Sequence, residues 1–459
     1  MQRDGRHQAL IAAAPLLCWA AAAWLARRDS AAFIEATDVA CALAIVTSYA
    51  AACALHVLRA GPQARTALLR VLLATGVGLV LLALLETPAL LGRLDYRALL
   101  DQATGNWRGP ASEYQLDYER AFRRRGNVHI VGRPQGDIAS RYNLPIRSPR
   151  PLEFTFNARG FRGRSELHRA DVALVGDSFV EGWYVSDGET CADRLAARIG
   201  RPVANLGQSG YGVEQELRVL RRDALPLLPR MLVWFFYEGN DLYDDEQFDD
   251  MLEYLAHAQG TPEQIARRLG YGRSGFREAS FTLNAFAALR RVLDPLIPNG
   301  MPYHGVFRDA ERGEVELYFQ ADGVGEVGVF EQERLAKAVL ALREGKRLLD
   351  QRGIALLVAY VPAKFRVYRE WCRFKPDSPC REWRPSDLPQ RVAHACSDAG
   401  IEFLDLTGPF QVQAAAGHLL YVPQDTHWDR AAHEQVAALL EARYRALGPA
   451  PAPAGEAIH

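Results

Sequence analysis

The sequence has no excess of charge of either sign. Lysine and arginine together number 54, aspartate and glutamate number 55, and the formal net charge at pH 7 is −1. A protein that binds nucleic acid through its phosphates needs a basic surface, and this balance gives no indication of one. The composition therefore predicts no nucleic-acid partner.

Common metal- and phosphate-binding motifs are also missing. The seven cysteines and eleven histidines form no zinc-type cluster, and no phosphate-binding loop motif is present. We therefore expect no cofactor and no metal. Cys372 and Cys380 bracket a polar segment and could close a small disulfide loop in an oxidising compartment, although other pairings stay open.

Charged residues are nearly absent from three stretches near the N-terminus, residues 9–26, 39–58 and 67–92. Each approaches the roughly 20 residues that a membrane-spanning helix needs, and we predict three such helices within a transmembrane region of residues 1–93. A signal peptide is the alternative for the first stretch, and core helices of a soluble domain are the alternative for all three.

Basic residues predict the orientation of these helices. Five of them are consistent with a cytoplasmic side: Arg3, Arg6, Arg59, Arg65 and Arg70. Arg27 and Arg28 are not consistent with it. Three crossings from a cytoplasmic N-terminus place the remaining chain outside the cytoplasm. The expected location is the inner (cytoplasmic) membrane, with a periplasmic catalytic domain and possible envelope protein partners that the sequence does not identify.

The rest of the chain divides by composition. We predict a polar juxtamembrane segment at 94–165, a catalytic domain at 166–447 with an insertion at 242–330, and a flexible tail at 448–459 rich in proline, alanine and glycine. The run Arg123–Arg125 could contact anionic lipid headgroups or simply form a solvated face.

Apolar runs typical of buried strands alternate with candidate helices in the catalytic domain. The predicted strands are 172–175, 203–205, 231–237, 355–361 and 402–406, and the predicted helices are 190–199, 213–225, 331–351, 387–399 and 430–447. This alternation predicts an α/β fold, a parallel sheet with helices on both faces in three layers.

Gly176-Asp177-Ser178 ends the first of these strands abruptly. Ser178 would lie at the carboxyl edge of the sheet, where open α/β folds bind ligands, and a serine there can be a nucleophile. The alternative is a serine that only caps the next turn. The Gly-x-Ser-x-Gly elbow of α/β-hydrolases is not formed, because Val180 occupies its last position.

Three further blocks follow in order, Asn205–Gly212, Glu238–Asp241 and Asp425–Trp428. Together with the Ser178 block, they resemble the SGNH (GDSL-type) hydrolase superfamily over roughly residues 155 to 445. The resemblance implies a flavodoxin-like SGNH fold, with Ser178 as nucleophile, His427 as base and Asp425 as its orienting carboxylate. It also implies an oxyanion hole formed by the N–H groups of Ser178 and Gly210 and the side chain of Asn240.

Two positions depart from the usual pattern of the superfamily. The aspartate precedes the histidine by two residues rather than three, as in the Asp-x-His-Trp loops of relatives that acetylate polysaccharides. Glu238 stands where glycine is usual. Ser209 is a rival nucleophile, and Gly239-Asn240-Asp241 could be only a turn.

Acidic and aromatic residues gather in and just before the insertion. The acidic residues could bind calcium or form a solvated helix start: Asp241, Asp244, Asp245, Glu246, Asp249 and Asp250. The aromatic residues could stack on sugar rings or pack a small core: Tyr303, Phe307, Tyr318 and Phe319.

The expected function is that of a membrane-anchored serine esterase acting on acyl esters, O-acetyl above all, of an extracytoplasmic carbohydrate. The substrate follows from the resemblance and the location rather than from any residue. A polysaccharide O-acyltransferase with the same residues is one alternative, and a catalytically silent scaffold subunit of the envelope is another.

Overall fold

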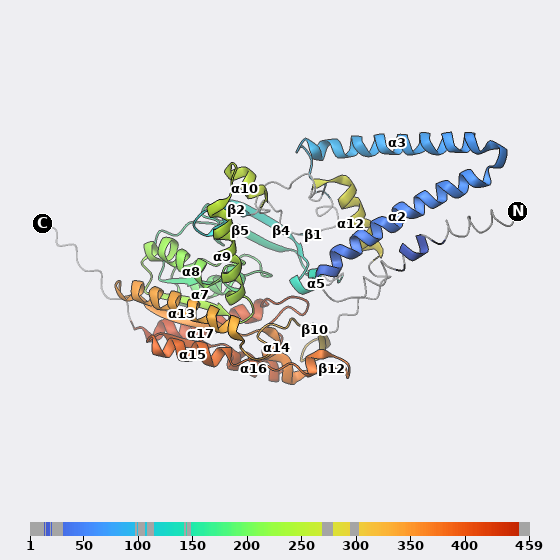
Figure 1. Ribbon diagram of the computed structural model, residues 1–459. Helices are drawn as coiled ribbons and strands as arrows, with labels where there is room; N and C mark the ends of the chain where they lie inside the picture. The colour runs from blue at the N-terminus through green and yellow to red at the C-terminus, as the bar shows by residue number, and fades with distance from the viewer. Residues whose placement is uncertain are drawn as a thin grey trace. The chain divides into compact units, whose positions relative to one another are not determined.

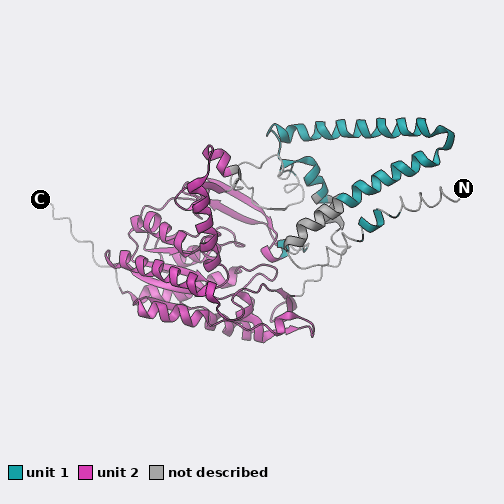
Figure 2. Cartoon of the chain, viewed as in Figure 1, with its two compact units in different colours: residues 1–104, 139–145, 274–301 teal, residues 105–138, 146–273, 302–459 magenta. Residues whose placement is uncertain are grey.

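The full-length chain is represented by a computed structural model (Figure 1). The structure describes residues 13, 15–18, 20, 31–96, 99, 106–107, 114–141, 144, 148–268, 279–293 and 303–448. Two compact units divide the chain (Figure 2), one of residues 1–104, 139–145 and 274–301 and one of residues 105–138, 146–273 and 302–459. The second unit contains every residue predicted to be catalytic.

A five-stranded sheet in the order β13-β11-β8-β6-β7 is the centre of the second unit, and all its strands are parallel. The strands are β6 Val172–Val175, β7 Val203–Asn205, β8 Met231–Tyr237, β11 Ala355–Val361 and β13 Glu402–Asp405. All residues of β6 and β8 are buried, because helices cover both faces of a parallel sheet. The strands predicted from the sequence are confirmed.

The two faces of the sheet belong to separate hydrophobic clusters. Leu174 packs with one set of helices and its neighbour Val175 with the other, as the alternation of side chains along a strand requires. The first set is α7 Cys191–Ile199, α14 Lys364–Tyr368, α16 Thr407–Ala415 and α17 Arg430–Ala446. The second is α8 Val213–Val219, α13 Val329–Asp350 and α15 Leu388–Asp398. The predicted three-layer α/β architecture is confirmed.

The predicted helix at 213–225 changes geometry part of the way along. Its α-helical part ends at Val219, and a π-helical turn (Leu220–Ala224) and a 3-10 turn (Leu225–Leu227) follow. Pro226 prevents the α-helix from continuing, because proline has no N–H to donate to the carbonyl one turn earlier.

Two small sheets formed by residues 106–107, 114–134 and 152–156 belong to the second unit. The hairpin β2-β3 joins Tyr114–Asp117 to Ala121–Arg124, and a second sheet joins β1 Asn106–Trp107, β4 Val128–Pro134 and β5 Leu152–Phe156. The short helix α5, Asp137–Arg141, follows β4. Arg124, in the middle of the basic run, is only 2% exposed and pairs with Glu181, so neither a lipid contact nor a solvated face describes it.

The predicted insertion contains helices and a β-hairpin. The helices are α9 Asp241–His257, α10 Pro262–Arg268 and α12 Phe281–Leu293, and the hairpin joins β9 His304–Asp309 to β10 Gly313–Tyr318. Strand β12, Cys372–Phe374, pairs with β9. Helix α12 lies in the first unit, where the Glu86 carboxylate accepts hydrogen bonds from its first turn.

Side-chain burial shows which of the predicted roles fit the acidic and the aromatic residues of the insertion. Asp241 and Asp245 are buried, so a fully solvated acidic helix start is wrong for them, and Asp249 is instead paired with cationic side chains of α13. Phe307 and Phe319 belong to the core, which assigns these two aromatic residues to packing rather than to sugar binding.

The apolar N-terminal stretches form long helices where the structure describes them, α2 Ala31–Arg59 and α3 Ala64–Leu90. Among the described residues, one helical stretch, Gly61–Leu90, is long and apolar enough to cross a membrane, with a mean hydropathy of 2.5, and Leu43–Arg59 is shorter. Most of the first predicted span, residues 9–26, lies outside the described residues. A single helix of this kind is weak evidence, so three membrane helices remain a prediction.

Two further sequence predictions concern the cysteines and the C-terminus. Cys372 and Cys380 are free thiols in the structure. The predicted tail, apart from Gly448, lies outside the described residues.

Candidate active site

The nucleophile candidate lies at the carboxyl edge of the central sheet. Ser178 begins the short helix α6, Ser178–Glu181, directly after β6. Gly176 is required between them, because a Cβ there would lie 2.6 Å from Cγ2 of Val180. The Asp177 carboxylate accepts a hydrogen bond from the N–H of Phe179 at 2.9 Å and caps α6. The N–H of Ser178 belongs to the first helical turn and therefore has no partner within the helix.

Ser178, His427 and Asp425 form one hydrogen-bonded chain. Ser178 Oγ lies 2.7 Å from His427 Nε2, and His427 Nδ1 lies 2.6 Å from Asp425 Oδ1. A carboxylate can only accept here, so Nδ1 carries the proton and the neutral ring presents Nε2 as an acceptor to the serine. Asp425 is fully buried, whereas Ser178 and His427 keep 8% and 12% of their surface exposed. The structure thus places the three residues predicted from the sequence next to one another.

The loop around Asp425 explains how a spacing of two residues can work. Asp425 Oδ1 also accepts the backbone N–H of His427 at 2.8 Å, which closes a tight turn and places the ring over the same oxygen. The other carboxylate oxygen accepts the N–H of Asp137 at 2.7 Å. Both oxygens are thus held by backbone donors, and the carboxylate cannot rotate freely.

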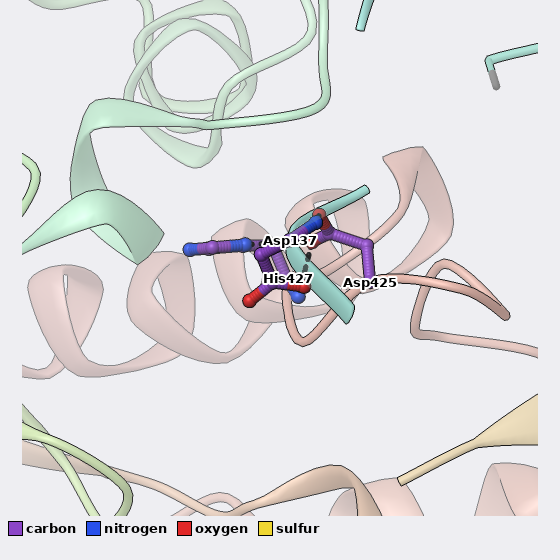
Figure 3. A group of neighbouring side chains, drawn as sticks. All are labelled: Asp137, Asp425 and His427. Carbon is purple, nitrogen blue, oxygen red and sulfur yellow. Dashed lines mark hydrogen bonds and ion pairs between the residues drawn. The ribbon is translucent and has the colours of Figure 1, made fainter. Parts of the chain in front are cut away.

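Asp137 is a site residue that the sequence analysis missed. Figure 3 shows its side chain beside those of Asp425 and His427. Its Oδ1 accepts the N–H of Thr426 at 2.8 Å, and its Oδ2 bonds the Thr426 hydroxyl, so it fixes the loop between Asp425 and His427. No sequence signal marks it, because 288 residues separate it from Asp425.

Electrostatics make His427 a strong base. Burial alone lowers the pKa of its imidazole, but the Asp425 carboxylate raises it by charge and hydrogen bonding, and the result is a pKa of about 9. Burial raises the pKa of the Asp137 carboxyl to about 6, and the neighbouring Asp425 charge adds to this. Burial likewise raises the pKa of Asp177 to about 6. The Asp425 carboxylate, in direct contact with the ring, thus stabilises the imidazolium form of His427.

Asp137, Asp425 and His427 are also, among the described residues, a group of three potential metal ligands with donor atoms within 4.8 Å of one another. Hydrogen bonds already occupy their ligand atoms: His427 Nδ1 bonds Asp425, and both Asp137 oxygens bond Thr426. This arrangement fits an oriented general base better than a metal centre.

Two predicted oxyanion donors, Gly210 and Asn240, lie on loops after β7 and β8. Gly210 has φ +78, a conformation that favours glycine, and it is exposed. Asn240 is the N-cap of α9, and its Nδ2 donates to Asp244 Oδ2 at 2.6 Å, which leaves the second N–H of the amide for a ligand. The role of these two residues as oxyanion donors is a proposal.

Glu238, which stands where the superfamily usually has glycine, is held by hydrogen bonds from residues at the start of α14. It is 5% exposed, accepts the N–H of Ala363 at 2.8 Å and pairs with the guanidinium of Arg366. The substitution is thereby accommodated by a buried ion pair that joins the end of β8 to the start of α14.

The ion pair of Arg124 with Glu181 stabilises the end of α6, the helix that begins with Ser178. Arg124 donates to both oxygens of Glu181, at 3.0 and 2.6 Å, and Glu181 also accepts the N–H of Ser209 at 2.9 Å. Arg162, which follows β5, donates to the carbonyls of Glu181 and Gly182 at the end of α6. Side chains from the segment that precedes β6 therefore hold the helix that begins with Ser178 in place.

Ser209, the rival nucleophile, lacks a base. Its hydroxyl oxygen is buried without a hydrogen-bond partner in the part of the chain that the structure describes. A serine needs a base within hydrogen-bond reach to act as a nucleophile. The geometry therefore favours Ser178.

Comparison with known proteins gives two sequence matches. Residues 318–457 match the family model described as "SGNH hydrolase-like domain, acetyltransferase AlgX". The probable alginate O-acetylase AlgJ of Azotobacter vinelandii is 35% identical over 112 residues, which cover 24% of this chain and 28% of that protein. The chain thus spans less than a third of the length of the curated relative that it matches.

Among solved structures, the chain matches a GDSL-like lipase from Bacteroides thetaiotaomicron with 13% sequence identity and a TM-score of 0.30. The match covers 60% of this chain and 88% of the lipase chain. An acetylxylan esterase from Geobacillus stearothermophilus, solved as a catalytic mutant, is 10% identical and covers 61% and 95%, with a TM-score of 0.32. At this level of similarity the two structures say nothing about the substrate of this chain. The family match over residues 318–457 and the α/β fold agree with the resemblance predicted from the sequence: this part of the chain is similar to an SGNH hydrolase-like domain.

Proposed function

We propose that the chain is a serine-dependent enzyme that cleaves acyl esters, with O-acetyl groups of an extracytoplasmic carbohydrate as its substrate. The observation that carries the chemistry is the hydrogen-bonded chain of Ser178, His427 and Asp425, at 2.7 and 2.6 Å. The acetyl group and the carbohydrate are supported by the description of the matching family and by the printed name of the AlgJ relative. The location rests on the predicted membrane topology.

In the first half-reaction, His427 Nε2 takes the proton of Ser178 as the serine oxygen attacks the ester carbonyl. The imidazolium is stabilised by the buried Asp425 carboxylate, which cannot rotate away because two backbone N–H groups hold it. Collapse of the tetrahedral intermediate releases the alcohol, which receives the proton from His427. The acyl group is then bonded to Ser178.

The negative oxygen of the intermediate needs converging donors. We assign the N–H of Ser178, the N–H of Gly210 and the side-chain N–H of Asn240 to this role. The first is supported by its place in the first turn of α6, the second by the exposed, left-handed glycine, and the third by an amide with one N–H directed at Asp244 and one to spare. Water, activated by His427, then hydrolyses the acyl-enzyme.

An O-acyltransferase is the second candidate, because the matching family is described as an acetyltransferase and the relative is named as an O-acetylase. The same residues would serve, with a sugar hydroxyl in place of water in the second half-reaction. Adding an oligosaccharide acceptor during hydrolysis of an acetyl ester separates the two. A transferase forms acetylated acceptor in proportion to acceptor concentration, whereas an esterase releases acetate alone.

A fluorophosphonate label on the purified full-length protein tests the proposal itself. We expect Ser178 to be labelled in the wild type, no labelling in Ser178→Ala, and normal labelling in the matched control Ser209→Ala. Turnover of p-nitrophenyl acetate should follow the same order. An unlabelled wild type would favour the silent scaffold, and a labelled Ser178→Ala variant would contradict the assignment of the nucleophile.

A further inference from the structure

A buried lysine donates hydrogen bonds to residues 422–425, the loop that carries Asp425 and leads to His427. Lys364 begins α14, directly after β11, and only 4% of its surface is exposed. Its Nζ donates to the carbonyls of Val422 at 3.0 Å, Pro423 at 2.9 Å and Asp425 at 2.6 Å. An ammonium group has three N–H donors, so all of its hydrogen-bonding capacity is used on one loop of four residues.

These carbonyls belong to the segment that presents the base. The N–H of Val422 donates to the carbonyl of His427 at 3.0 Å, and the N–H of Asp425 donates to the carbonyl of Val422 at 3.2 Å, so the loop is closed on itself just outside the catalytic pair. Two of the three carbonyls that Lys364 binds have a second donor, the N–H of Asp425 for Val422 and the N–H of Tyr318, at 2.9 Å, for Pro423. Lys364 supplies the hydrogen bond to the carbonyl of Asp425, and a buried carbonyl left without a partner is costly.

Several charged groups face this lysine. The groups with the largest electrostatic effects on its pKa are the carboxylates of Asp137 and Asp425, followed by Cys372 and Asp322, and its Nζ also lies 5.9 Å from the centre of the Phe319 ring. Burial lowers the pKa of Lys364, and the carboxylates oppose this effect. Its three carbonyl acceptors match the three N–H donors of a protonated amine.

We propose that Lys364 is a positioning residue of the active site: its ammonium holds the carbonyls of residues 422–425 and so keeps Asp425 and His427 aligned on Ser178. This inference rests on the proposed function. Lys364 does not touch the reacting atoms and acts through the loop.

Lys364→Met tests the proposal, since methionine fills a similar volume without charge or donors. We expect kcat/KM for p-nitrophenyl acetate to fall roughly 10- to 100-fold, as for a small misplacement of a catalytic group, with the loss in kcat and KM little changed. Lys364→Arg, which keeps the charge and the donors, should recover part of the lost rate. Lys375→Met, at an exposed lysine eleven residues along, is the matched control.

The NMR resonances of the His427 ring, assigned with His427→Gln, read the position of the ring without turnover, and we expect them to shift in Lys364→Met. Unchanged ring resonances together with unchanged kcat/KM in Lys364→Met overturn the proposal, as does a loss of activity that lies in KM alone. If Lys364→Met does not fold, Lys364→Gln, which keeps two donors but no charge, is read in its place. Absence of labelling at Ser178 in the wild type would instead refute the proposed function, and the ring resonances would still decide the role of Lys364.

Discussion

Replacing Asp425 by asparagine changes one oxygen to an NH2 group in a site where both oxygens accept hydrogen bonds. One oxygen faces Nδ1 and the N–H of His427, and the other faces the N–H of Asp137, at 2.6, 2.8 and 2.7 Å. An asparagine can accept on one side only. It must either point its NH2 at the N–H of Asp137 or turn it toward Nδ1 and impose the wrong tautomer on the ring.

The magnitude follows from the contact that is lost. Breaking a buried, charged pair by removing one charge costs about 3–5 kcal/mol. The imidazolium exists only once His427 has taken the serine proton, so this cost falls on the transition state. At ~1.36 kcal/mol for each factor of ten, we expect kcat to fall by about 10²- to 10⁴-fold. His427→Ala should be nearly inactive, because it removes the base itself.

The assay is hydrolysis of p-nitrophenyl acetate by full-length variants in detergent, with folding checked by thermal unfolding. Asp429→Asn is the matched control, since Asp429 lies in the same segment but only caps α17, by accepting the N–H groups of Ala431 and Ala432. Its rate should stay within about threefold of the wild type. Full activity in a folded Asp425→Asn variant would show that the carboxylate is merely a loop residue and that the site is a Ser-His dyad.

Three other outcomes are expected. Because His427 must be neutral to accept a proton and its pKa is raised to about 9, kcat/KM should rise with pH and level off only near pH 9; a profile that is flat from pH 6 to 10 would contradict this. Arg124→Met should lower the free energy of unfolding, measured by denaturant titration, by about 3–5 kcal/mol, because it leaves Glu181 buried and unpaired. Arg123→Met, the control, should lower it by about 1 kcal/mol or less. Equal effects of the two substitutions would refute the buried pairing. A reporter that is active only in the periplasm should be active when fused after Gly448, and activity of a cytoplasm-only reporter there would show that the predicted number of membrane crossings is wrong.

The sequence by itself predicted the strands and helices of the α/β domain and the three residues that the structure joins in one hydrogen-bonded chain. Period and composition are local properties, so the unbroken apolar run of β8 and the glycine turn before Ser178 could be read directly. The Asp-x-His spacing of Asp425 and His427 is local as well. Their meeting with Ser178 followed from the resemblance to a superfamily with a known order of blocks.

The tertiary structure alone decided what surrounds that site. Asp137 bonds the catalytic loop across 288 residues of chain, Lys364 reaches it across 58 to 61, and Arg124 pairs with Glu181 across 57. Nothing in a local pattern distinguishes such a buried charge from a solvated one, because its environment is made by segments that only folding brings together. The basic run at Arg123–Arg125 shows the consequence: the composition suggested solvent or lipid, and the fold placed Arg124 in the interior, where a buried carboxylate requires it.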